Sequence, residues 1–167
     1  ARSAAAAALL ALLSLAGFVR APDTPVFYRD LAAPDAEVDA AAALSLVNDY
    51  RAKEGLAPLT LDGRLVEIAR EQAGALAKAD SVRVSLRAER ALERRLERAG
   101  YAAGRAVENT SAGYRTLAEA FSGWRESERH RRNMLDPDAD RFGIATAYAP
   151  ASKYRVFWTA VFVDTSP

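Results

Sequence analysis

Tyr154-Arg-Val-Phe-Trp-Thr-Ala-Val-Phe-Val163 is a long run of strand-forming residues close to the end of this 167-residue chain. Successive side chains of a strand point to opposite faces of a sheet. Both alternating sets of this run contain large apolar groups, so both faces of the strand need cover. The run therefore predicts a central strand with helices packed on each side of it.

The residues before this run predict the second half of a hairpin. From Phe142 to Ala149, large residues alternate with glycine and alanine, and a turn from Pro150 to Lys153 leads into the final run. Ala106 to Asn109 reads as a further short strand. Strands joined by a short turn pair antiparallel, so the sheet is expected to be antiparallel.

Helical periodicity dominates the chain upstream of the hairpin. Four helices are expected: from about Val38 to Lys53, from an N-cap at Asp62 to about Ala79, from about Ser85 to Ala99, and from a capping box at Thr116 to Ser127 or slightly beyond. Helices come early and the hairpin comes last. That order favours the α+β class over alternating βαβ units.

The third of these helices is densely charged, and its arginines are open to two interpretations. A solvated outer face with i,i+3 pairs, Arg90 with Glu93 and Arg94 with Glu97, is the favoured one. A phosphate-binding patch is the alternative. On the favoured interpretation the helix faces the core with leucines alone, namely Leu86, Leu92 and Leu96.

Composition excludes several classes of function. A chain of this length with 50% hydrophobic residues suits one domain with one core. Lys and Arg number 23 against 22 Asp and Glu, for a net charge of +1, so no basic excess argues for nucleic acid. Cysteine is absent, which excludes disulfides and thiolate metal sites in this chain.

The N-terminal residues predict export from the cytoplasm. Arg2 precedes an apolar run from Ala4 to Phe18, shorter than the roughly 18 to 20 residues that a membrane-spanning helix needs. Residues 1–18 are therefore expected to be a cleaved signal peptide, or else an uncleaved anchor that supplies the only membrane contact. Residues 19–37 read as a proline-containing linker or arm, and residues 38–167 as the folded domain.

Several motifs, in order and spacing, resemble the CAP superfamily (the SCP domain of cysteine-rich secretory proteins, antigen 5 and pathogenesis-related-1 proteins), and in particular its bacterial, cysteine-free branch. The resemblance covers about Ala41 to Val163. It is carried by Val47-Asn-Asp-Tyr-Arg51, Gly55-Leu-Ala-Pro-Leu59, Ala99-Gly-Tyr101, Glu108-Asn109, Trp124-x-x-Ser127-x-x-His130-Arg-x-Asn-Met-Leu135, Phe142-Gly-Ile144 and Phe157-Trp-Thr159. It implies an α-β-α sandwich around an antiparallel sheet, in a secreted or periplasmic protein.

The same resemblance implies a cleft of two histidines and two glutamates, which holds a divalent metal in some members. Glu108 matches the first glutamate and His130 the second histidine, but Val84 stands near the first histidine and Ser127 near the second glutamate. Glu126 and Glu128 flank Ser127, and the sequence leaves open whether either supplies a second carboxylate. His130 is the only histidine, so the donors make a poor zinc site. No metal and no cofactor are expected.

Three functions remain open. The favoured one is a binding module for a lipid, a peptide or another cell-envelope component, with a cleft lined by Glu108, Asn109, Ser127 and His130. The second is a metal-independent hydrolase with Ser127 as nucleophile, His130 as base and Glu108 as orienting carboxylate, although the chain lacks a Gly-x-Ser-x-Gly elbow. The third is an envelope protein-interaction domain with a vestigial cleft, so enzyme activity is left undecided and the oligomeric state unassigned.

Some of these residues also have purely structural interpretations. His130 is a candidate for a hydrogen bond to Glu108 that would tie its helix to the sheet. Asn48 and Arg51 are interpreted as structural, and Trp124 and Trp158 as core. Three tyrosines are less committed and are candidates for lining a cleft, namely Tyr101, Tyr114 and Tyr148.

Overall fold

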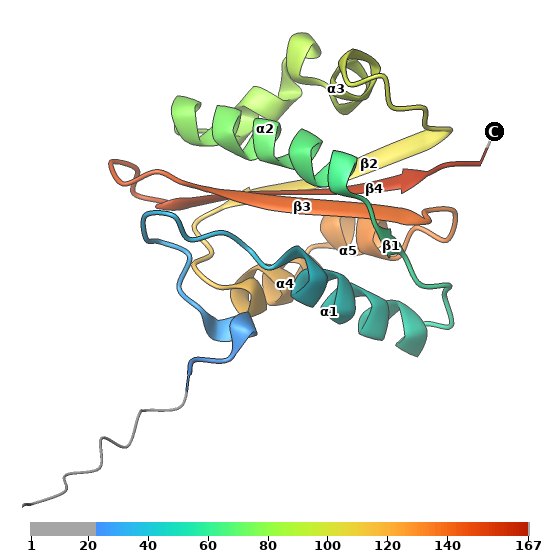
Figure 1. Cartoon of the computed structure of the whole chain (residues 1–167), viewed down its shortest axis with the longest axis horizontal. Coiled ribbons are helices and arrows are strands. Elements are labelled where there is room, and N and C mark those ends of the chain that lie inside the picture. The colour runs from blue at the N-terminus through green and yellow to red at the C-terminus, as the bar shows by residue number, and fades with distance from the viewer. Residues whose placement is uncertain (1–22, 167) are drawn as a thin grey trace, which may run out of the picture.

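The computed structural model describes residues 23–166, so the predicted signal or anchor segment at 1–18 lies outside the described part of the chain. A four-stranded sheet with the order β1-β3-β4-β2 forms its middle layer (Figure 1). The strands are β1 (Thr60–Leu61), β2 (Arg105–Ala112), β3 (Arg141–Tyr148) and β4 (Val156–Asp164). The three long strands pair antiparallel, whereas the two-residue β1 is parallel to β3 and was not predicted.

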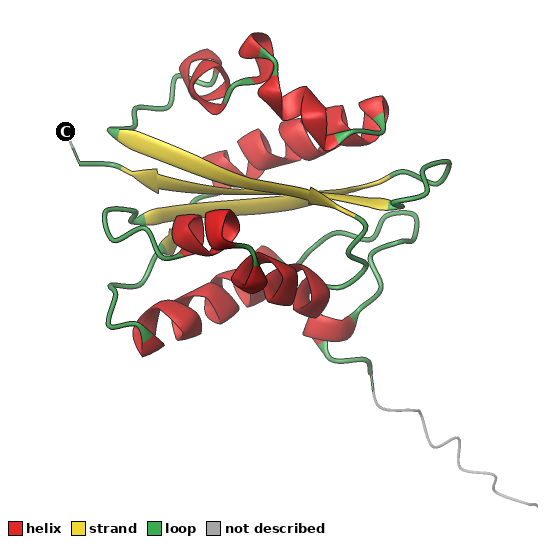
Figure 2. Cartoon of the chain, turned by 180° about the vertical axis from the view of Figure 1, so that it is seen from behind, coloured by secondary structure: helices red, strands yellow, loops and turns green. Residues whose placement is uncertain are grey.

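Helices cover both faces of the sheet, which confirms the predicted α-β-α sandwich (Figures 1 and 2). One face carries α2 (Gly63–Ala79), the 3-10 turns η2 (Val82–Leu86) and η3 (Ala88–Arg90), and α3 (Leu92–Arg98). The other face carries α1 (Ala40–Lys53), α4 (Leu117–Glu126) and α5 (Glu128–Met134). No helix within residues 23–166 is both long and apolar enough to cross a membrane.

Strand β4 is the centre of the core, as the apolar run predicts. Every residue from Val156 to Val163 is buried. One set of alternating side chains, which includes Trp158 and Phe162, packs toward α1 and α4. The other set, which includes Phe157, Val161 and Val163, packs toward α2 and α3. A strand apolar on both faces is therefore stable only between two helical layers, and this strand occupies that position.

Two predicted helices differ from the observed ones. The residues expected to form one helix over 85–99 form η2, η3 and the shorter α3, and Leu86, expected in the core, is 76% exposed. The helix opened by the Thr116 capping box ends at Glu126, because Ser127 has extended backbone angles (φ −81°, ψ 116°) and a separate α5 begins after it. Ser127 and His130 therefore do not share one continuous helix.

The segment before α1, expected to be a linker or arm, packs against the helical layer that contains α1 and α4. The turn η1 (Val26–Tyr28) contacts α4, and Phe27 packs against the α1–α4 core. Leu31 is buried, and its backbone N–H donates to the Arg115 carbonyl at 2.8 Å. The segment thereby covers an edge of that core.

Candidate functional site

Strand β2 positions the two adjacent residues Glu108 and Asn109 on opposite faces of the sheet. Glu108 pairs with Val161, which packs in the α2–α3 core, and Asn109 pairs with Ala160, which packs in the α1–α4 core. Because strand side chains alternate, the Glu108 carboxylate lies under α3 while the Asn109 amide lies over α5. The two residues therefore belong to different layers.

The Glu108 carboxylate is held by a residue that the sequence interpretation placed on the surface. Arg95 of α3 is buried, and its guanidinium forms an ion pair and hydrogen bond with Glu108 Oε2. Arg95 also donates through Nε to the Arg90 carbonyl at 3.1 Å. The prediction of a fully solvated arginine face was wrong for Arg95, which lies on the same helical stripe as the buried Leu92 and Leu96.

Burial and this ion pair act on Glu108 in opposite directions. Desolvation raises the pKa of Glu108, because burial disfavours the charged carboxylate, and Arg95 opposes that rise by favouring the charge. Only 13% of the Glu108 side chain is exposed, and the Arg95 side chain has no exposure. The carboxylate is therefore a buried partner of an arginine and faces little solvent.

Asn109 fastens α5 to the sheet. Its Nδ2 donates to the His130 carbonyl at 3.0 Å, and its Oδ1 accepts from Asn133 Nδ2 at 2.9 Å. Asn133 Nδ2 also lies 3.0 Å from the Glu108 carbonyl, on the outer edge of β2. Sequence reasoning singled out Asn109 as a cleft residue but quoted Asn133, which completes the network, only as part of a motif and gave it no role.

The His130 side chain is half-buried beside an aromatic pair. Its ring lies 6.4 Å from the Trp124 ring, centroid to centroid, and Trp124 in turn packs edge-on against Trp158. Burial lowers the pKa of His130, and the nearby Arg129 lowers it further, so the imidazole is neutral at pH 7. A neutral imidazole offers one hydrogen-bond donor and one acceptor.

The structure does not join the three residues of the hydrolase hypothesis by hydrogen bonds. Across the described part of the chain, no hydrogen bond links the His130 ring to Glu108 or to Ser127. Ser127 is the N-cap residue of α5, and its side chain makes no capping hydrogen bond. His130 is attached to β2 through its backbone carbonyl, and the expected hydrogen bond between its ring and Glu108 is replaced by the Arg95 pair.

The donor set at this edge does not fit a divalent metal. Val84, at the position of the first histidine, is buried with Leu76 and Phe157 and offers no ligand atom. Glu126 and Glu128 are exposed and line other hollows. Within residues 23–166, no group of three histidine or acidic side chains is close enough to hold a metal ion.

The tyrosines considered for a cleft are divided by the structure. Tyr101 is 9% exposed and donates its hydroxyl to Asp62 Oδ2 at 2.7 Å, and burial together with Asp62 raises its pKa to about 12. Tyr114 packs against the α1–α4 core, with its hydroxyl close to Gly123. Tyr148 lines a hollow at the opposite edge of the sheet from β2.

The comparisons with known proteins agree with this architecture. The cysteine-rich secretory protein family matches residues 44–162. The fold is similar to an extracellular SCP-domain protein of Bacillus anthracis (TM-score 0.64, 23% identity, 74% of this chain and 39% of that one). It is also similar to a cysteine-rich secretory protein of Staphylococcus aureus (TM-score 0.57, 21% identity, 74% of this chain and 38% of that one).

A third similar structure is an outer surface protein of Borrelia burgdorferi (TM-score 0.67, 18% identity, 75% of this chain and 92% of that one). The chain thus spans about two fifths of the length of the first two proteins. These identities are low, so the likenesses show the fold alone. A comparison with curated protein sequences found no match.

Proposed function

The chain belongs to the cysteine-rich secretory protein (CAP) family, and from that premise we propose that it is a metal-independent binding module that acts outside the cytoplasm. The observation that carries this proposal is the buried Arg95–Glu108 pair. Glu108 is the residue that matches a cleft glutamate of the family, and a guanidinium already neutralises it. The carboxylate is therefore committed to structure instead of to a metal or to an imidazole.

The location rests on two supports. The apolar run from Ala4 to Phe18 has the form of an export signal. The similar proteins are described as an extracellular protein and an outer surface protein. A secreted or periplasmic location accounts for both of these observations.

The binding edge that we propose consists of β2 with α5 beside it. Ser111 and Gly113 direct their peptide groups to β4, since Gly113 N–H donates to the Val156 carbonyl, so Thr110 and Ala112 direct theirs outward. The neutral His130 ring adds a donor and an acceptor that no described protein group uses. Such an edge suits uncharged polar groups, for example the hydroxyls or amides of a lipid, peptide or envelope component.

Zinc titration tests the metal-independent part of the proposal. We expect calorimetry on the purified protein to show no zinc binding tighter than micromolar, since one imidazole and one committed carboxylate are too few ligands. One-to-one zinc binding at nanomolar affinity, lost in His130→Ala, would overturn the proposal.

Native mass spectrometry tests ligand binding at the edge. Protein purified gently from its own envelope fraction is expected to carry an added mass that organic solvent removes, and His130→Ala is expected to reduce the occupied fraction. Tyr28→Ala, an exposed change on the turn η1, serves as the control. A bare wild-type mass, or equal occupancy in all three proteins, would favour the vestigial cleft.

The hydrolase alternative has its own readout. A fluorophosphonate probe labels an activated serine, so labelling of Ser127 that disappears in His130→Ala would replace the binding proposal with catalysis. The proposal expects no labelling of Ser127.

A further inference from the structure

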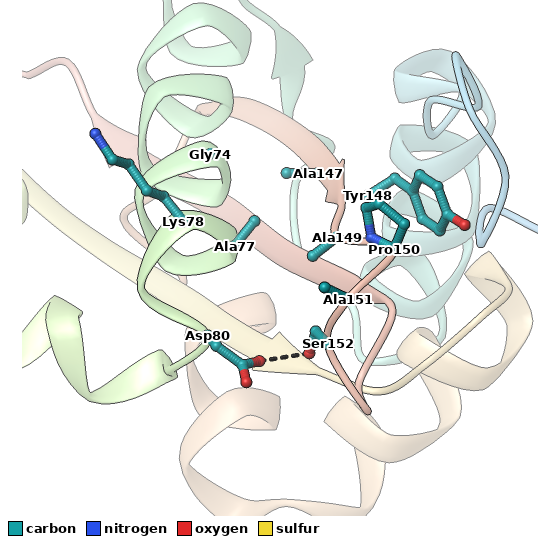
Figure 3. Close-up of a pocket in the computed structure, with 10 residues that line it drawn as sticks. All are labelled: Gly74, Ala77, Lys78, Asp80, Ala147, Tyr148, Ala149, Pro150, Ala151 and Ser152. Atoms are coloured by element: carbon teal, nitrogen blue, oxygen red, sulfur yellow. Dashed lines mark hydrogen bonds between the residues drawn. The ribbon is translucent and has the colours of Figure 1, made fainter.

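A hollow of about 510 Å³ lies at the edge of the sheet remote from β2, between the C-terminal half of α2 and the β3–β4 turn (Figure 3). Small side chains form its walls: Gly74 and Ala77 on α2, and Ala147 and Ala149 on the strand side. At one end of the hollow, the Ser152 hydroxyl donates a hydrogen bond to the Asp80 carboxylate, so we assign it no role in ligand binding (Figure 3). The hollow is therefore lined mostly by small apolar side chains, and the Ser152–Asp80 hydrogen bond lies at one end of it.

The strand edge beside this hollow has unused backbone hydrogen-bonding groups. Strand β1 pairs only with Arg141 and Phe142, so β3 has no strand partner on that side beyond Phe142. Ala149 N–H donates to the Arg155 carbonyl across the hairpin, so the preceding Tyr148 directs its peptide N–H and C=O outward. Within residues 23–166, neither of these two Tyr148 groups has a hydrogen-bond partner.

At Gly74, no side chain projects from α2 into the hollow. This glycine lies in the interior of α2, where glycine is less stable than alanine, and an added Cβ at this position would meet no atom within 4 Å. No packing contact of the described structure therefore requires glycine there. The absence of a side chain instead leaves room for a chain to approach the helix backbone closely.

The walls of the hollow are also braced. The Arg155 guanidinium donates to the Pro150 carbonyl and to the Tyr148 hydroxyl, each at 2.7 Å. These two contacts brace the hairpin internally, and the hydrogen bond from Ser152 to Asp80 joins its turn to the C-terminal end of α2. A site that is already formed loses little conformational entropy when a ligand binds.

We propose that this hollow binds an extended peptide segment of a partner protein, which adds to the sheet at Tyr148 and places a small side chain between α2 and β3. Unused peptide groups are best satisfied by another backbone, and side-chain pockets beside the edge then give specificity. A hydrocarbon chain would contact the apolar walls of the hollow but would leave the Tyr148 peptide groups buried without hydrogen bonds. Lys78 on the rim, which has no partner among the described residues, suits an acidic residue of the same peptide.

The test uses a phage-displayed library of random dodecapeptides, selected on the wild-type protein and counter-selected on Gly74→Gln. The matched control is Gly63→Gln, at the start of the same helix, where an added Cβ also meets nothing within 4 Å. Synthetic selected peptides are then measured by fluorescence anisotropy. We expect at least tenfold weaker binding to Gly74→Gln, unchanged binding to Gly63→Gln, and unfolding midpoints of both variants no lower than wild type.

N-methylation of the selected peptide distinguishes strand addition from side-chain binding alone. Methylation of the amide that faces Tyr148 is expected to weaken binding at least tenfold, and methylation of its two neighbours is expected to have little effect. Failure to enrich any peptide on wild type over Gly74→Gln, or equal affinity for the methylated peptides, would overturn the proposal. His130→Ala is expected to leave this binding unchanged, so the result is independent of the β2 edge.

Two other occupants are distinguished in the same set of proteins. A wild-type dimer in sedimentation equilibrium that Gly74→Gln dissociates would assign the hollow to a second copy of the chain and overturn the peptide proposal. A fatty acid retained in native mass spectrometry by wild type, but not by Gly74→Gln, would overturn it in favour of a lipid.

Discussion

Arg95 and Glu108 form a buried ion pair, and burying the charge of either residue without the other would cost considerable free energy. Both side chains are almost fully removed from solvent, so each charge is stabilised chiefly by the other. Among the described residues, Arg95 is the only hydrogen-bond donor to the Glu108 carboxylate, whereas Arg95 also donates to two backbone carbonyls. Loss of the arginine therefore leaves a carboxylate without a partner in a desolvated position.

Arg95→Met is expected to destabilise the protein by about 3 kcal/mol at pH 7, because it leaves Glu108 buried and unpaired. The double variant Arg95→Met with Glu108→Gln is expected to recover most of that loss. Urea unfolding at constant pH measures both. Arg94→Met, in the adjacent exposed position, is the control and is expected to change stability by less than about 0.5 kcal/mol. An equal loss in the single and double variants would contradict the role assigned to the pair.

His130 makes the stability of the fold depend on pH. Its pKa in the folded state lies below the ordinary value of 6.5, so the unfolded chain takes up the proton more readily than the folded one. Stability is therefore fully present above pH 6.5 and falls as the pH decreases through that value toward the folded pKa. No other histidine exists in the chain to obscure the effect.

The urea midpoint of the wild-type protein is accordingly expected to be lower at pH 5.5 than at pH 7.5, a pH range of about two units in which histidine titrates. His130→Gln, which cannot take up that proton, is expected to show a smaller difference between the two pH values. Parallel pH dependence in the two proteins would show that the imidazole is not desolvated in the fold.

The N-terminal ends of α4 and α5 are capped differently, although the N-cap residue of each helix carries a hydroxyl group. At α4, Thr116 accepts from the Glu119 backbone N–H at 3.2 Å, and the Glu119 side chain completes a capping box. At α5, the Ser127 side chain makes no capping hydrogen bond. The same residue class at the same position therefore contributes differently to the two helices.

Thr116→Ala is expected to cost about 1 kcal/mol of stability, since it leaves an end N–H of α4 without its cap. Ser127→Ala is the matched change at α5 and is expected to cost less than about 0.5 kcal/mol. Thermal or urea unfolding of the two variants measures the contrast. A cost at Ser127 as large as that at Thr116 would mean that its hydroxyl has a partner, which would strengthen the hydrolase alternative.

On the scale of the whole molecule, Arg51 connects distant parts of the chain. It is fully buried in α1, and its guanidinium donates to backbone carbonyls of the two loops that lead into β1 and β3. The carbonyls belong to Ala57, Met134, Asp136 and Ala139, at distances from 2.8 to 3.3 Å. One side chain thus holds α1, the end of α5 and the start of β3 together.

Arg51→Met is expected to cost about 3 kcal/mol or more, because several buried carbonyls lose their donor at once. Hydrogen exchange is expected to show the largest loss of protection between residues 134 and 140. Lys53→Met, an exposed change on the last turn of the same helix, is the control and is expected to alter neither quantity. A uniform loss of protection across the chain would contradict a local role for Arg51 in joining these loops.

Much of the fold could be predicted because its signals are local. The apolar run at β4, the caps at Asp62 and Thr116, and the stripe of α2 each depend on residues within a few positions of one another. The break at Ser127 was missed, as were the short turns η2 and η3 that replace the first part of the helix predicted over 85–99, since periodicity alone overestimates helix length. The parallel pairing of β1 was missed because two residues carry no periodic signal.

By itself, the sequence determined that the core strand is β4 and that helices cover both faces of the sheet, and it singled out Glu108, Asn109 and His130 as residues of interest. Only the tertiary structure decided which partner each of these residues has. Arg95 reaches Glu108 because α3 packs over β2, and the outward-facing peptide groups of Tyr148 lack a strand partner because β1 ends after two residues. Periodicity reports burial along one element, whereas the partner of a buried charge or an open strand edge depends on how separate elements meet.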